Sequence, residues 1–279
     1  MDFSIKKVLL TVAVLMTIVS SNLVAKGGYV ELPGDFDDSS NNITNPWWPQ
    51  PSGQTQVFLE EADDECVVGV VQVIATANQS RATVDGIKVR EIWDREYIDN
   101  SPESCDGNLG DNGDWELTES TFDWYAEDIH GNVWYYGERS VATDHDECDH
   151  ETDGVDPVIG LEGCLDGSWE AGYDIWEEQP DEDILAGIIM LASPEKGQFY
   201  FQEYWEDEAT DMGKVLNFKD VETALFGDQQ GCLVTKEWVP LEPGNVEHKY
   251  YCYGHGLVLV EGNAGGKTVW TDLVNVIDP

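Results

Sequence analysis

The feature that most constrains the fold is an aromatic-rich segment over residues 122–138. From 122 to 127, apolar side chains alternate with Asp, Tyr and Glu, which is the period-2 pattern of a β-strand. Residues 128–132 supply an Asx residue and a glycine, the chemistry of a tight turn. Residues 133–136 resume as a return strand that aromatic cross-strand pairs would stabilise. The segment predicts a structural β-hairpin; a carbohydrate-stacking platform built from the same aromatic side chains is the alternative.

Other segments rich in Val, Ile, Tyr, Phe and Trp are separated by Gly, Asn, Asp and Pro, which is typical of a protein built from β-strands. Helical signal is weak and is confined to 206–216 and 220–226, where short helices are expected. The sequence predicts a mostly-β protein: a curled antiparallel sheet (half-barrel) or a β-sandwich, with few short helices. The expected strands cover 56–60, 66–77, 82–97, 117–128, 132–140, 198–205, 232–239, 247–253, 256–261 and 268–276.

The N-terminus has the features of a secretory signal peptide. Lys6 and Lys7 precede an apolar run of about 12 residues, which is too short to span a bilayer, and Ala25 is a candidate cleavage position. The mature chain is expected to be secreted or periplasmic, with no membrane insertion after signal removal. The expected organisation is a signal peptide over 1–25, a flexible leader over 26–44, and a single mostly-β domain over 45–279 with polar insertions at 99–114 and 142–163.

All six cysteines follow the expected signal peptide. An even number of cysteines in an oxidising compartment indicates disulfides, although several pairings are compatible with the sequence. The pairing that we favour joins Cys232 to Cys252 across neighbouring strands, Cys148 to Cys164 around an acidic loop, and Cys66 to Cys105. A thiolate metal site is the alternative, but the sequence has no CxxC motif.

The chain is strongly acidic, with 56 Asp and Glu residues against 14 Lys and Arg and a formal net charge of −42. Such a charge repels nucleic acid and anionic membranes, so we expect no nucleic-acid partner. Three explanations remain open. The charge could reflect adaptation to a saline or cold marine habitat, the binding of divalent cations with calcium first, or a cationic partner or substrate.

The densest set of candidate metal ligands lies within 144–151: Asp144, His145, Asp146, Asp149 and His150. Imidazole nitrogens could hold zinc or copper, and the carboxylate oxygens could hold calcium. The spacing matches neither an EF-hand loop nor HExxH, so a solvated acidic loop is the alternative. The Asp- and Asn-rich insertion at 99–114 is a weaker calcium candidate.

Three further side chains are weak catalytic candidates: Glu203, Glu242 and His248. A histidine beside a carboxylate can act as an acid–base pair, and two carboxylates can hydrolyse a glycosidic bond. Strand alternation over 247–253 would place His248 and Lys249 on opposite faces. A solvated acidic surface and a satisfied sheet histidine are the alternatives. The sequence has no Gly-x-Ser-x-Gly elbow and no phosphate-binding loop, which disfavours serine-hydrolase and nucleotide chemistry.

The chain carries several short sequence blocks in this order: DWYA at 123–126, GNVWY at 131–135, GSWEAG at 167–172, QEY at 202–204, and LEPG at 241–244 leading into EHKYY at 247–251. On these blocks the chain resembles an uncharacterised family of secreted bacterial proteins, over roughly residues 45–261. The resemblance implies no activity. The two polar insertions, the additional cysteines and His255 depart from the pattern of that family.

Together these observations predict an exported soluble binding protein that is not an enzyme, with an unknown small molecule, glycan or cation as its ligand and calcium as a candidate cofactor. The alternative is a secreted hydrolase of polysaccharide or ester bonds that uses carboxylates and a histidine.

Overall fold

The computed structural model describes residues 28–62, 65–99, 105, 115–143, 148–241, 244, 246–264 and 267–279. The expected signal peptide therefore lies outside the described residues. Almost every regular element is a β-strand, and one large antiparallel sheet of 16 strands is accompanied by a two-stranded sheet. The large sheet curls without closing into a barrel, which confirms the predicted mostly-β class and its curled-sheet form.

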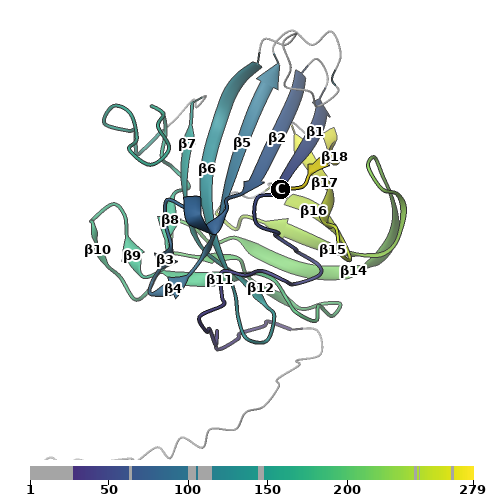
Figure 1. Ribbon diagram of the computed structural model, residues 1–279, viewed down its shortest axis with the longest axis horizontal. Helices are drawn as coiled ribbons and strands as arrows, with labels where there is room; N and C mark the ends of the chain where they lie inside the picture. Colours follow the sequence, from purple (N-terminus) through teal and green to yellow (C-terminus); the bar gives the residue numbers. More distant parts are fainter. Residues whose placement is uncertain are drawn as a thin grey trace, which may run out of the picture.

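The strands are β1 (Thr55–Ala62), β2 (Glu65–Val73), β3 (Thr83–Val84), β4 (Ile87–Lys88), β5 (Arg90–Asp99), β6 (Trp115–Glu127), β7 (Val133–Ala142), β8 (Trp169–Glu170), β9 (Tyr173–Asp174), β10 (Gln179–Pro180), β11 (Leu185–Met190), β12 (Phe199–Phe201), β13 (Glu203–Tyr204), β14 (Met212–Thr223), β15 (Gly227–Trp238), β16 (Val246–Cys252), β17 (Gly256–Ala264) and β18 (Lys267–Ile277). Figure 1 shows β7, β6, β5, β2 and β1 side by side, with β14, β15 and β16 running across them. The main hydrophobic core draws its buried residues from both of these groups of strands.

The predicted aromatic hairpin is confirmed as β6 and β7. Asp128 closes its turn by accepting hydrogen bonds from the backbone N–H groups of His130 and Asn132, each at 2.9 Å. Across the hairpin, the rings of Tyr125 and Tyr135 stack with centroids 4.6 Å apart. The hairpin aromatics are largely buried, as its structural interpretation requires.

Two predictions about local structure are wrong. The short helices expected at 206–216 and 220–226 are absent, since β14 occupies most of this region and pairs with β12 and β15. Strand pairing here overrides the weak helical pattern. The single strand expected over 82–97 is instead divided, because Asp85 and Gly86 have φ of 45° and 76° and form the tight turn between β3 and β4.

Residues 28–44, which we expected to belong to a flexible leader, lie against the sheet. The Val30 N–H donates to the Phe199 carbonyl at 2.8 Å, and the Ser40 carbonyl accepts from the Glu127 N–H at 2.7 Å. Ile43 is buried in the main core. The polar composition of this segment concealed the few apolar side chains that anchor it.

All three favoured disulfides are present: Cys66–Cys105, Cys148–Cys164 and Cys232–Cys252. The first ties the 99–114 insertion to β2, and Cys105 is the one described residue between 100 and 114. The second returns the 142–163 insertion to the end of β7, where Ala142 forms a β-bridge with Cys164.

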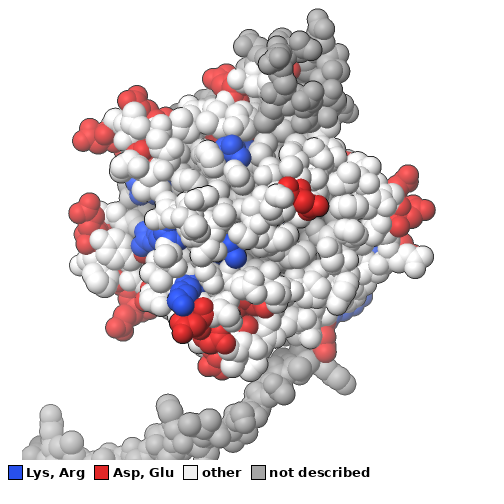
Figure 2. Space-filling view, viewed as in Figure 1, with Lys and Arg blue, Asp and Glu red and all other residues white. Residues whose placement is uncertain are grey.

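The acidic side chains are unevenly placed on the surface. On the face seen in Figure 2 they gather in groups around the rim, while much of the centre is neither acidic nor basic. In the part of the chain that the structure describes, no helix has the length and hydropathy needed to cross a bilayer.

Candidate functional site

One cavity gathers an unusual number of carboxyl groups, and we call it the acidic pocket. Its volume is about 470 Å³, and no lysine or arginine is among the described residues that line it. A pocket of this size is in the range of small-molecule sites. The carboxyl side chains that line it are Glu138, Asp149, Asp166, Glu203, Glu208 and Asp211.

A β-bulge in β7 directs Glu138 into this pocket. The pairing of β7 with β6 shifts register at Tyr136, so Tyr136 is an extra residue. The shift brings Glu138 onto the face of Tyr135, whose hydroxyl lies 2.7 Å from a Glu138 carboxylate oxygen. Gly137 permits the bulge because its φ is 130° and its missing Cβ would lie 2.3 Å from the carbonyl oxygen of Trp169.

The Tyr135 hydroxyl joins two carboxyl groups. It lies 2.6 Å from Asp123 Oδ1 and 2.7 Å from Glu138 Oε2. A phenol has one proton to donate, so it can satisfy both contacts only when one carboxyl group is protonated. Burial raises the pKa of Asp123 to about 7 and raises the pKa of Glu138 well above its ordinary value, with the Glu203 charge adding to the effect on Glu138. The geometry therefore indicates that the three side chains share a proton.

Glu203 approaches Glu138 from β13. Burial raises the pKa of Glu203 well above its ordinary value, and the charges of Asp211 and Asp123 raise it further. The Trp169 indole N–H and Lys249 act in the opposite direction. Trp169 is fully buried, and its indole nitrogen makes no hydrogen bond of ordinary geometry. This end of the pocket combines crowded carboxyl groups with an unsatisfied donor.

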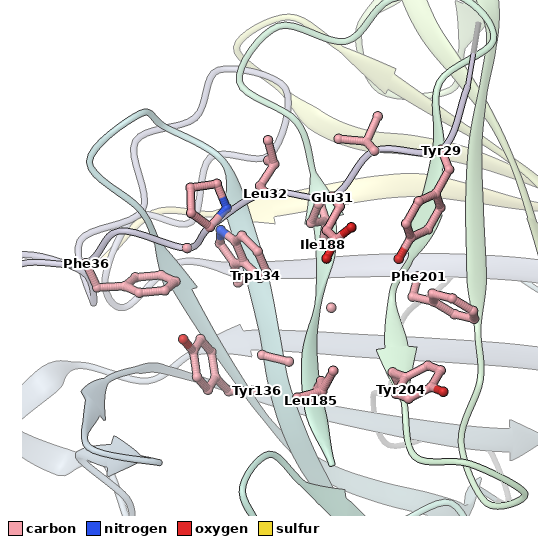
Figure 3. Close-up of a pocket in the computed structure, with 15 residues that line it drawn as sticks. Tyr29, Glu31, Leu32, Phe36, Trp134, Tyr136, Leu185, Ile188, Phe201 and Tyr204 are labelled. Carbon is pink, nitrogen blue, oxygen red and sulfur yellow. The ribbon is translucent and has the colours of Figure 1, made fainter. Parts of the chain in front are cut away.

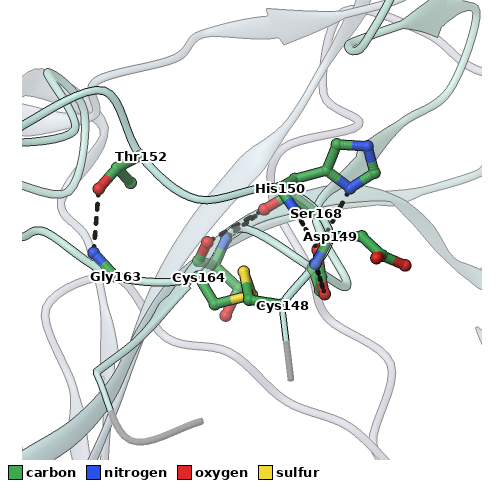
Figure 4. The surroundings of a disulfide bond; sticks show 9 residues. Cys148, Asp149, His150, Thr152, Gly163, Cys164 and Ser168 are labelled. Carbon is green, nitrogen blue, oxygen red and sulfur yellow. Dashed lines mark hydrogen bonds and ion pairs between the residues drawn. A yellow bond between two sulfur atoms is a disulfide. The ribbon is translucent and has the colours of Figure 1, made fainter. Parts of the chain in front are cut away.

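The pocket rim is held by the Cys148–Cys164 disulfide (Figure 4). Beside it, the backbone N–H groups of Asp149 and His150 each donate to Asp166 at 3.0 Å. Burial acts to raise the pKa of Asp166, but these donors hold its pKa below the ordinary value. The His150 ring stacks on Trp176 with centroids 3.8 Å apart. These contacts fix the imidazole and one indole at the mouth of the pocket.

The structure brings three of the candidates from the sequence into one pocket: Glu203, Asp149 and His150. The other proposed metal ligands (Asp144, His145 and Asp146) and the catalytic candidate Glu242 lie outside the described residues. Among the described residues, the one group of three donors close enough to share an ion is Cys148, Cys164 and Asp166. The two cysteines form a disulfide, so this group offers a metal only the carboxylate.

His248 does not join Glu203. Its Nδ1 lies 3.5 Å from Glu261 Oε2 on the neighbouring strand. On the other face of β16, the Lys249 ammonium lies 3.0 Å from Glu237 Oε2, and its charge lowers the pKa of Glu203. The predicted alternation of His248 and Lys249 is confirmed, and it turns the histidine away from the acidic pocket.

A serine, a histidine and an aspartate also meet at this pocket, but they do not form a catalytic triad. Ser168 Oγ donates to the Ser140 carbonyl at 3.1 Å and accepts the Ser140 N–H at 3.0 Å. It is buried, and no hydrogen bond joins it to His150. Ser168 is therefore a structural link between β7 and the loop before β8.

Sequence reasoning missed Glu138, Asp123 and the two tryptophans of the pocket, Trp176 and Trp205. Asp123 and Glu138 are carboxyl groups embedded in runs of aromatic residues, which is the signal that could have singled them out. The tryptophans carry no local signal, because they come from loops and short strands whose arrangement depends on the sheet.

A second cavity, which we call the aromatic groove, has a volume of about 530 Å³. Figure 3 shows its side chains arriving from β7, β11, β12, β13 and the N-terminal segment. Glu31 is the one acidic side chain among the described residues that line it. Its aromatic members are Tyr29, Phe36, Trp134, Tyr136, Phe201 and Tyr204.

Comparison with known proteins does not assign the chain to a family. No protein-family model matches the chain, and no curated protein matches it. Among solved structures, a Bacteroides fragilis protein described as exported and as having a YmcC-like fold is 10% identical, with a TM-score of 0.39, covering 84% of this chain and 100% of its own. A Parabacteroides distasonis protein described as a lipoprotein is 10% identical, with a TM-score of 0.36, covering 84% of this chain and 99% of its own.

Proposed function

We propose that the protein is an exported, non-enzymatic binding protein that takes a cationic ligand in the acidic pocket. The observation that carries this proposal is the set of six carboxyl groups around one cavity, with no lysine or arginine among its described lining. The N-terminal sequence and the three disulfides support export, because disulfides persist in oxidising compartments.

The physical reason is that the carboxyl groups of this pocket repel one another when they are ionised and no cation lies between them. Burial raises the pKa values of Glu138 and Glu203; the Glu203 charge raises the first further and the Asp211 charge raises the second further. A bound cation offsets this repulsion and replaces the shared proton. Binding should therefore stabilise the folded protein, by about 2.7 kcal/mol at a ligand concentration 100 times Kd.

The test is thermal unfolding with a panel of cations: calcium, zinc, simple diamines and amino sugars. We expect at least one cation to raise Tm by about 5 °C at saturating concentration. Glu203→Gln should abolish that rise without lowering the Tm of the free protein, because it removes a carboxyl group from a crowded, partly buried site.

Two matched controls sharpen this test. Tyr204→Leu alters the neighbouring residue, which faces the aromatic groove, and should keep the cation response. Glu222→Gln removes one exposed carboxylate outside the pocket, so it tests general charge. The proposal fails if no cation changes Tm, or if Glu222→Gln weakens the response as much as Glu203→Gln does.

A second candidate function is hydrolysis of a glycosidic bond by Glu138 and Glu203. The observation that favours it is that both side chains line one pocket, where burial raises both pKa values and the Glu203 charge raises the pKa of Glu138 further, as in a carboxylate pair that works as acid and base. Release of reducing ends from a polysaccharide panel tests it. Activity that both Glu138→Gln and Glu203→Gln abolish would establish the hydrolase and overturn the non-enzymatic proposal.

A further inference from the structure

We propose, building on the cation-binding function above, that the ligand is an amino sugar with a free amine: the carboxyl groups of the acidic pocket hold its ammonium group, and Trp176 and Trp205 pack on its ring. Three observations about the pocket lead to this class of ligand: the spread of its carboxyl groups, its two indoles, and the unsatisfied indole N–H of Trp176.

The carboxyl groups are too widely spread for a preformed metal site. A calcium ion takes six to eight oxygens at about 2.3–2.6 Å, which requires several carboxylate oxygens close together. Among the described residues, the one group of three possible metal donors within 4.8 Å of one another contains two disulfide sulfurs, so no three carboxylate or imidazole donors lie that close. The six carboxyl groups instead surround about 470 Å³, which is the space of an organic molecule.

Two indoles line the same cavity as the carboxyl groups. The rings of Trp176 and Trp205 lie within 20° of parallel, with centroids 6.5 Å apart. His150 stacks on Trp176 and holds that ring in place. An indole attracts a nearby cation through its negative face and packs against the apolar face of a ring. Carboxylates alone would suit any cation, whereas carboxylates with aromatic rings favour an organic ammonium compound.

The pocket also contains a donor that needs an acceptor. Trp176 lines the pocket, and its indole nitrogen is buried and makes no hydrogen bond within the described part of the chain. Because a simple amine offers no acceptor once protonated, this N–H group favours a ligand that also carries hydroxyl oxygens. An amino sugar has the ammonium group, the apolar ring face and the hydroxyl groups together.

The experiment is calorimetric titration of the full mature protein with four probes: glucosamine oligosaccharides, their N-acetylated counterparts, putrescine and calcium chloride. We expect the free-amine oligosaccharides to bind. N-acetylation keeps the ring and most hydroxyl groups but removes the charge, so it should weaken binding at least about tenfold. Putrescine keeps the charge without the ring or hydroxyl groups and should also bind at least about tenfold more weakly.

Variants separate pocket binding from general attraction to an acidic surface. Trp205→Leu should weaken binding of the glucosamine oligosaccharide about tenfold and should weaken putrescine binding less. Trp270→Leu removes an exposed tryptophan on β18 and should leave the affinities for the oligosaccharide and for putrescine unchanged. Equal binding of putrescine and glucosamine oligosaccharides, or binding of calcium alone, would overturn the amino-sugar class and leave cation binding intact. Binding of none of the charged probes would overturn both.

Discussion

The acidic pocket and the aromatic groove have similar volumes and share the strands β7 and β13, yet their chemistry is opposite. Neighbouring residues of β13 line different cavities: Glu203 the acidic pocket and Tyr204 the aromatic groove. On β7, Trp134 and Tyr136 line the groove, whereas Glu138 lines the pocket. These strands therefore act as a wall between two sites.

The comparison teaches that strand alternation alone does not assign the faces. Trp134, Tyr136 and Glu138 are spaced by two and would share a face on a regular strand. The bulge at Tyr136 reverses the assignment beyond it. Burial of the aromatic face stabilises the folded protein at every pH, whereas burial of the acidic face destabilises the folded protein when its carboxyl groups are ionised. Because such a destabilising arrangement is expected at functional sites, we expect the acidic pocket to bind a ligand.

Breaking the bulge should have the largest effect. Gly137→Ala forces a Cβ to within 2.3 Å of the Trp169 carbonyl oxygen at a residue with φ of 130°. We expect the free energy of unfolding to fall by about 3 kcal/mol or more, because both strain and overpacking act there. Urea unfolding measures this change.

Gly227→Ala is the matched control for that substitution. Gly227 has φ of 64°, but a Cβ there would meet nothing within 4 Å. It should cost only about 1 kcal/mol, from backbone strain alone. Equal losses in the two variants would show that the close approach of β8 to the bulge is unimportant.

Removing the disulfide at the pocket rim should separate stability from binding. Replacing Cys148 and Cys164 with serine opens a loop of sequence separation 16 and should cost about 3 kcal/mol. It should also weaken cation binding, because this disulfide anchors Asp149 and His150. Replacing Cys232 and Cys252 should cost a similar amount but leave binding unchanged, since neither lines the pocket. Calorimetric titration at a temperature where both variants are folded distinguishes the two outcomes.

A smaller effect should appear in the pH dependence of stability. Burial, with the charges of Asp123 and Glu119, raises the pKa of Asp94 from 3.8 to about 8. The folded state therefore binds more protons than the unfolded state between these values, and the free energy of unfolding falls as pH rises from about 4 to about 8. Asp94→Asn should flatten this slope and stabilise the protein at pH 8 by about 1–2 kcal/mol.

Urea unfolding at pH 5 and pH 8 measures that slope. The exposed Asp183→Asn removes the same charge and should leave the slope unchanged. Substitutions in the aromatic groove, such as Tyr204→Leu, should change the free energy of unfolding by the same amount at both pH values, so they should also leave the slope unchanged. A slope that survives Asp94→Asn would show that this carboxyl group does not carry the pH dependence.

Much of the fold could be predicted because its signals are local. The turn residues Asp128 and Gly131 and the alternating aromatics of 122–138 specify a hairpin without reference to the rest of the chain. The strand β14 was missed because its polar side chains weaken the period-2 pattern, and its pairing with β15 decides its conformation.

For the candidate site, the sequence identified Glu203, Asp149 and His150 as chemically suitable but could not show that they share a pocket. The sequence allowed His248 to pair with Glu203 or Glu242, but His248 contacts Glu261, on the face of β16 opposite Lys249, and it is Lys249 that acts on Glu203. The partner that the structure supplies, Glu138, is separated from Glu203 by the whole 142–163 insertion and by β11.

The sequence by itself determined the mostly-β class and the aromatic hairpin, and it narrowed the disulfide pairing, because strand alternation, turn chemistry and cysteine number are properties of short segments. Only the tertiary structure decided which carboxyl groups meet. That depends on one bulge at Tyr136 and on the curl of a sheet in which β1 pairs with β18 and β7 with β11. Register and curvature are set by packing of the whole core, so no short segment encodes the acidic pocket.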